Sequence, residues 1–162
     1  MNYNSTICDY VTLYLNDGTN DGTSKITFQI ANSAYLNNSR GPYCLVSVAD
    51  ASIRTANNNE NVLIGMENIY NHGSSSIHTP AILGNFSCVT GDATGEYFHE
   101  FIPNKIAYLT PPRPNLITLS FIKQDKSTTL PTNGHVTLKF EYLDAIGLVA
   151  SDEVTAYTPA FS

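Results

Sequence analysis

The side chains that most often do chemistry in proteins are sparse in this chain and are not grouped. The four histidines are His72, His78, His99 and His135. His72 and His78 lie in one Gly/Ser-rich stretch without a nearby carboxylate, so a solvated loop is a better interpretation than a metal site. His99 and Glu100 are neighbours in an expected strand. They would point to opposite faces there and could not act together as acid and base.

The three cysteines are an odd number, and each lies in an apolar, strand-like run. They are Cys8, Cys44 and Cys88. No pair has the spacing of metal ligands, and none has the electropositive surroundings of a reactive thiol. The pattern predicts three reduced thiols that fill core positions, which is typical of a reducing compartment.

The acidic residues with the most suggestive spacing are Asp17 and Asp21, in a repeated Asn-Asp-Gly-Thr motif. Calcium prefers such oxygens, but a calcium loop also needs further acidic ligands, in particular a late Glu, so plain turns are favoured. No Gly-x-Ser-x-Gly nucleophile motif occurs, and no Gly-rich loop precedes an expected helix. We therefore predict no catalytic residue, no metal and no cofactor, and a protein that is not an enzyme.

Composition points to a single domain with little charge. The chain has 162 residues, of which 42% are hydrophobic and 14% charged, with a net charge of −6. The charged fraction of ordinary domains is about 25%, so this surface is expected to be largely covered by neighbours or built for contact. The acidic balance predicts no direct nucleic-acid binding. No secretion signal is visible and no apolar run approaches the roughly 20 residues of a membrane span.

The elements that must position any site are strands. Apolar and polar residues alternate with a period of two in several runs, separated by turn residues, and no convincing amphipathic helix occurs. The expected strands cover Ile7–Leu15, Lys25–Ala31, Tyr43–Ile53 with a bend near Ala49, Val62–Ile69, Pro80–Val89 with a bulge at Gly84, Glu96–Ile102, Lys105–Leu109, Leu116–Lys123 and His135–Leu143. This pattern predicts an all-β fold, a single jelly-roll β-sandwich of about eight strands in two packed antiparallel sheets.

The chain divides into this domain, residues 1–143, and a tail, residues 144–162, in which the alternation ends. The tail is either a last strand or an arm that docks on a neighbouring subunit. Within the domain, the strands at 116–123 and 135–143 are joined by a polar loop and are expected to face each other as a hairpin.

Tyrosine carries more of the functional signal than histidine does. The chain has ten Tyr and no Trp, and tyrosine suits contact surfaces because it offers a large area with a polar tip. Tyr10 and Tyr14 are expected on the face opposite Val11, Leu13 and Leu15. The plain interpretation is two tyrosines on a solvated surface, and the functional one is a strand that meets another subunit. The candidate subunit contacts are Tyr10, Tyr14, Leu148, Val149, Tyr157 and Phe161.

The last two strands also carry a resemblance to a family. A Pro-rich lead-in, Asn115, an apolar strand, a loop with Leu130-Pro131 and then His-Val-Thr-Leu-Lys-Phe-Glu-Tyr resemble the closing strands of jelly-roll capsid proteins. They look most like those of virophages and adenovirus-like DNA viruses of the double-jelly-roll lineage. A chain of this length is too short for the two jelly rolls of a major capsid protein. The resemblance implies a penton or minor capsid subunit of the virion. Such a subunit would form a homopentamer at the fivefold vertices and contact trimers of the major capsid protein.

Two other classes compete with this interpretation. The first is a carbohydrate- or receptor-binding β-sandwich, such as a lectin-like head or a trimeric fibre knob, which Asn-rich loops and exposed tyrosines would suit. The second is a cupin-like enzyme, which shares the jelly-roll fold but needs a cluster of His and Glu metal ligands on its strands. The absence of Trp speaks against sugar stacking, and the scattered histidines speak against the enzyme.

Overall fold

The computed structural model describes residues 7–31, 44–56, 58–67, 69, 80–110, 114–125 and 127–142. Over these residues the fold is all-β, as predicted, with one short 3-10 helix, η1 (Leu15–Asp17). The strands are β1 (Ile7–Tyr14), β2 (Thr19–Asn20), β3 (Lys25–Gln29), β4 (Cys44–Ala56), β5 (Val62–Met66), β6 (Ala81–Gly91), β7 (Glu96–Phe101), β8 (Tyr108–Thr110), β9 (Leu116–Lys123) and β10 (Asn133–Tyr142).

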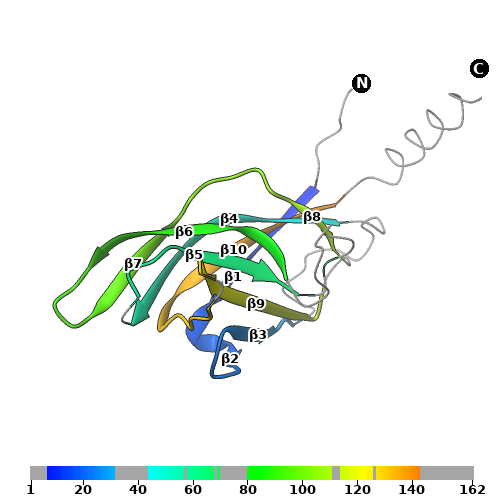
Figure 1. The fold of residues 1–162 in the computed structure, drawn as a ribbon. Helices are drawn as coiled ribbons and strands as arrows, with labels where there is room; N and C mark the ends of the chain where they lie inside the picture. Colours follow the sequence, from blue (N-terminus) through cyan, green and yellow to red (C-terminus); the bar gives the residue numbers. More distant parts are fainter. Residues whose placement is uncertain are drawn as a thin grey trace, which may run out of the picture.

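The ten strands form one continuous antiparallel sheet that curls over on itself (Figure 1). Its order is β1-β10-β4-β7-β6-β5-β9-β3-β2, and β8 pairs with the start of β4. The sequence predicts two packed sheets, whereas the structure has one sheet. The single sheet results because β7 pairs with β4 on one side and with β6 on the other. These two pairings join what would otherwise be two separate layers, and the sheet as a whole remains consistent with a β-sandwich.

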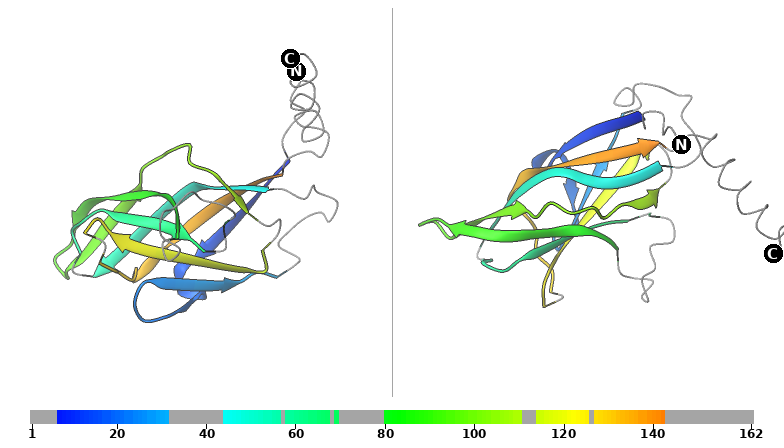
Figure 2. Two further views of the ribbon diagram at one scale, coloured as in Figure 1. Left: turned by 45° about the vertical axis from the view of Figure 1, so that its right-hand side comes forward. Right: turned by 90° about the horizontal axis from the view of Figure 1, so that it is seen from above.

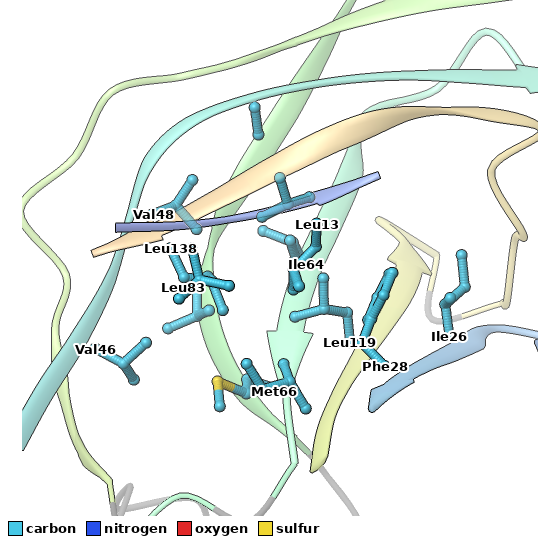
Figure 3. Packing of buried hydrophobic residues seen from close by; sticks show 14 of the residues in the cluster. Leu13, Ile26, Phe28, Val46, Val48, Ile64, Met66, Leu83, Leu119 and Leu138 are labelled. Carbon is cyan, nitrogen blue, oxygen red and sulfur yellow. The ribbon is translucent and has the colours of Figure 1, made fainter. Parts of the chain in front are cut away.

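Both halves of the curled sheet contribute to one hydrophobic core. In Figure 3, Val48 and Leu138 come from β4 and β10, and Ile64 and Leu119 come from β5 and β9; all four belong to one buried cluster. β1, β3 and β10 keep the period-two alternation from which they were predicted, since inward residues are buried and their neighbours are more exposed. β5 and β9 also bury consecutive residues, at Ile64–Met66 and Leu119–Phe121. The largest fully buried side chains are Phe86, Phe121 and Phe140.

Two irregularities expected from the sequence are present. The register of β4 against β10 skips Ala49, because Thr137 pairs with Asp50 and Leu138 pairs with Val48. A second register shift, between β5 and β6, lies beside Gly84. A bulge of this kind increases the local twist and so helps a long strand to curve around the core.

The prediction of a hairpin between the last two long strands is wrong. β9 pairs with β3 and β5, whereas β10 pairs with β1 and β4. The polar connection between them therefore crosses from one half of the curled sheet to the other. Several boundaries also differ. The strand expected at Lys105–Leu109 is Tyr108–Thr110, the one expected at Val62–Ile69 ends at Met66, and the one expected at Tyr43–Ile53 continues to Ala56.

Candidate functional site

The first strand has one buried face and one exposed face, as the sequence predicts. Val11, Leu13 and the following Leu15 are 4 to 8% exposed and belong to the core. Tyr10 and Tyr14 are 59% and 60% exposed, and Thr12 between them is also exposed. The tyrosines of β1 therefore stand on the outer surface, with most of their rings available for contact.

β1 is also an edge of the sheet. It pairs with β10 along its whole length without a register shift, from Ile7 opposite Tyr142 to Tyr14 opposite His135. Among the described residues no strand pairs along its other side. The right-hand view of Figure 2 shows β1, in dark blue, at the margin of the sheet beside β10, in orange. Alternate backbone N–H and C=O groups of such a strand point away from the sheet and can pair with another chain.

The charged side chains beside this face are paired with one another. On β10, the Nζ atom of Lys139 lies 2.7 Å from Oε1 of Glu141, and this contact raises the pKa of the lysine above its ordinary value. Nε2 of His135 lies 2.9 Å from Oδ2 of Asp50. Lys139 and Glu141 therefore compensate each other's charge beside the tyrosines, and the Asp50 carboxylate is in contact with His135.

One charge of β1 points inward, and sequence reasoning missed it. Asp9 is 6% exposed and lies near the buried thiol of Cys44. Burial raises the pKa of Cys44 to about 12, and the negative charge of Asp9 adds to the effect. Cys44 is thus an unreactive core residue, as expected, whereas Cys8 and Cys88 are only half-buried. The alternation that places Val11 and Leu13 inside could have identified Asp9, because all three residues have odd numbers.

The buried histidine is part of a small polar network rather than a catalytic pair. Nε2 of His99 lies 2.8 Å from Oγ1 of Thr55, and that hydroxyl is 3.1 Å from the carbonyl oxygen of Asn58. Burial lowers the pKa of His99, so the ring is held neutral. Glu100 is exposed on the opposite face, so the two residues do not work together, as predicted.

The histidine at the start of β10 is partly covered. The side chain of His135 is 31% exposed, and besides Asp50 its ring contacts the hydroxyl of Ser52 through Nδ1 at 3.4 Å. This arrangement holds β10 to β4 across the strand ladder. Ser52, His135 and Asp50 are the residue types of a nucleophilic triad, but the 3.4 Å contact of Ser52 is longer than the roughly 2.6–3.2 Å of an activated nucleophile.

Of the two acidic residues in the repeated turn motif, Asp17 ends η1 and Asp21 accepts hydrogen bonds from the backbone. Oδ1 of Asp21 accepts hydrogen bonds from the N–H groups of Thr23, Ser24 and Lys25, each at 2.9 Å. These bonds, led by the one from Lys25, hold the pKa of Asp21 well below its ordinary value. This carboxylate is a turn former, consistent with the preference for a plain turn over a calcium loop. Among the described residues, no group of three or more His, Cys, Asp or Glu could hold a metal ion.

An open depression of about 570 Å³ lies where β4, β6, β7 and β10 meet. Its lining includes Arg54, Phe98, Glu100 and Asn133. The guanidinium carbon of Arg54 lies 4.2 Å from the centre of the Phe98 ring, and the same side chain is 3.7 Å from Oε2 of Glu96. An aromatic ring bordered by planar polar groups can contact a polar ligand, but Arg54 already covers one face of the ring.

Several predicted residues lie outside the described residues. They are His72, His78, Leu148, Val149, Tyr157 and Phe161. The division into residues 1–143 and 144–162 likewise stays a prediction, since only the part before Leu143 is described. No helix in the described part of the chain is long and apolar enough to cross a membrane. No protein-family model matches this chain, and no curated protein is detectably similar to it.

Proposed function

We propose that this chain is a structural capsid subunit: a single jelly roll that assembles as a homopentamer at the fivefold vertices of a virion. It would contact neighbouring trimers of the major capsid protein and would carry out no catalysis. The observation that carries the proposal is the way the strands pair along the chain. The exposed edge formed by β1 is the second support.

The pairing supports a jelly roll once β2, a two-residue strand at one edge, and β7, which joins β4 to β6, are set aside. Without β2 and β7, eight strands remain. The first pairs with the last (β1 with β10), the second with the next to last (β3 with β9), the third with the sixth (β4 with β8) and the fourth with the fifth (β5 with β6). A long antiparallel ribbon that is rolled up gives this set of pairs, and such a rolled ribbon is the jelly roll. The fold alone does not determine a function, and capsid subunits are one of several uses of it.

The surface of β1 supports assembly into a ring. A closed ring needs two different patches on each subunit, each burying about 800 Å² per partner in an interface of standard size. Tyr10 and Tyr14 supply two exposed aromatic side chains on one strand, and aromatic anchors are enriched where subunits meet. The tail, residues 144–162, is the proposed second patch.

The test is the mass of the purified protein in solution, measured by native mass spectrometry and light scattering over a concentration series. Five copies are the expected result. Three copies would overturn the pentamer and favour a trimeric receptor-binding head. A chain that stays monomeric at high concentration, alone and with the major capsid protein of its virus, would overturn the capsid assignment.

A second candidate function is a carbohydrate- or receptor-binding head. The depression where β4, β6, β7 and β10 meet favours it, because Phe98, Glu100 and Asn133 place an aromatic ring beside polar groups that could bind sugar hydroxyls. A glycan array and the Phe98→Ala variant test this alternative. Specific binding that the variant loses would establish it, and an array without a binder would remove it.

A further inference from the structure

The edges of the curled sheet differ in how they are protected. Natural proteins shield exposed edge strands by keeping them short or by placing charges, prolines or bulges on them. The edge formed by β2 has two residues and leads into the Asp21 turn. β1 has eight residues, and from Tyr10 to Tyr14 it carries no charge, no proline and no register shift.

An unprotected stretch of this kind is a template for another strand. Its outer face offers Tyr10, Thr12 and Tyr14, all exposed. Cross-strand pairs of aromatic with β-branched residues, and of threonine with threonine, stabilise antiparallel strands by about 0.2–1 kcal/mol each. The same kind of pair already holds β1 to its inner neighbour, where the hydroxyls of Thr12 and Thr137 lie 2.9 Å apart. A strand added to the outer side of β1 would therefore best present β-branched and aromatic residues.

The tail of the chain contains such a segment. Residues Val154–Thr158 read Val-Thr-Ala-Tyr-Thr, which is β-favouring and uncharged, and Pro159 follows. The segment has the same length as the uncharged stretch Tyr10–Tyr14. The eleven residues between Tyr142 and Val154 can span about 35 Å when extended, which is enough to reach a neighbouring subunit of this size.

We propose that Val154–Thr158 of one copy of this chain pairs with β1 of a neighbouring copy as an added antiparallel strand. The inference rests on the proposed self-association and names the contact that would produce it. It belongs to the strand-addition mode of recognition, in which backbone hydrogen bonds give affinity and alternate side chains give specificity.

The geometry favours a neighbour over the same molecule. The tail starts where β10 ends, and that point lies beside the start of β1, because Tyr142 pairs with Ile7. A tail that turned back along its own β1 would run parallel to it and would have to cross the segment that precedes β1. Parallel pairing is slightly less stable per residue than antiparallel pairing, and connections at one edge of a sheet rarely cross each other. A tail that arrives from another subunit has neither constraint.

The test uses the full-length chain with the photo-reactive residue p-benzoylphenylalanine in place of Tyr157. Equal amounts of ¹⁵N-labelled and unlabelled protein are mixed, irradiated and digested, and the cross-linked peptides are identified by mass spectrometry. Backbone hydrogen exchange of residues 7–14 is followed in the unmodified protein over a concentration series. Light scattering on the same samples gives the oligomeric state.

The expected result is a cross-link from position 157 to residues 7–14 in isotopically mixed pairs, with exchange in β1 that slows at least tenfold as the oligomer forms. Thr12→Lys places a protecting charge on the exposed face and should weaken self-association about tenfold or more. Thr19→Lys on the opposite edge is the matched control and should leave it unchanged. Both threonines are exposed, so neither variant should unfold.

Three results would overturn the inference, and the first two leave the proposed function standing. An oligomer whose cross-links lie elsewhere removes the strand addition and leaves the capsid assignment standing. Cross-links confined to chains of one isotope, in a mixture that has been dissociated and reassembled before irradiation, show that the tail pairs with its own β1. A protein that stays monomeric at every concentration, with β1 exchanging freely, removes this contact and the homopentamer together.

Discussion

Replacing the two outer tyrosines of β1 should weaken assembly without weakening the fold. In Tyr10→Thr and Tyr14→Thr the new residue keeps a high strand propensity, so the change removes mainly the ring. Tyr10 and Tyr14 are 59% and 60% exposed in the subunit alone. A tyrosine buries about 200 Å² when fully covered, so each ring has about 120 Å² left to bury against a partner.

This remaining area sets the size of the effect. At about 25 cal/mol per Å², full coverage of one ring contributes up to about 3 kcal/mol to each interface. Because the rings do not fill the subunit's own core, each single variant should change the free energy of unfolding of the monomer by no more than about 0.5 kcal/mol. The dissociation constant of each interface should rise by a factor of about 10 to 100.

The assay compares oligomer mass over a concentration series with urea unfolding of the dissociated subunit. Val89→Thr is the matched control, because Val89 is 57% exposed on β6, away from β1. Variants that assemble like the original chain would refute the assignment of β1 as a contact surface. A loss of more than about 1 kcal/mol in the monomer's unfolding free energy would show that the rings stabilise the subunit itself.

Four further changes have defined outcomes. Deleting residues 144–162 should leave the circular dichroism spectrum and cooperative melting intact but weaken self-association; an unfolded product would assign the tail to the core. His99 is buried and its pKa is lowered, so on acidification the unfolded chain binds a proton at this residue before the folded chain does. As the pH falls below about 6.5, the free energy of unfolding should decrease by up to about 1.4 kcal/mol per pH unit. The decrease should be smaller in His99→Gln. Cys44, with its pKa raised to about 12, should resist thiol reagents at pH 8 until the protein is unfolded. A Cβ on Gly134 (φ +133°) would clash with the carbonyl oxygen of Ser52, so Gly134→Ala should lower the free energy of unfolding in urea by about 1–3 kcal/mol. Gly22→Ala is the control, because its added Cβ meets nothing within 4 Å and adds only positive-φ strain.

The positions and faces of the strands could be predicted because period-two alternation is a local signal. Val11 and Leu13 are buried while Tyr10 and Tyr14 are exposed, as the pattern indicates. The bend near Ala49 is a register shift in the structure. Such features depend on residues a few positions apart, so a single sequence contains the information.

The pairing of strands is not a local signal. Consecutive strands lie side by side about two thirds of the time, which is why β9 and β10 were expected to form a hairpin. Here the polar connection between them carries the chain across the core, and β10 instead lies between β1 and β4. The partners of β10 begin 126 and 89 residues before it, counted from Asn133 back to Ile7 and Cys44, and no short-range pattern specifies them.

The placement of the charges in β1 is the strongest link between the fold and the proposed contact. The strand has one charged residue, Asp9, which lies inward at its start. An outward charge among the tyrosines would protect the edge at almost no cost to the fold, because those positions are exposed. The chain instead keeps the stretch Tyr10–Tyr14 uncharged and places neutral aromatic rings there. An edge that is solvated throughout the life of a protein gains nothing from this composition and risks aggregation. The same composition is favourable where the edge becomes covered on assembly. A strand added there can pair with the uncharged stretch over about five residues, the length of Tyr10–Tyr14.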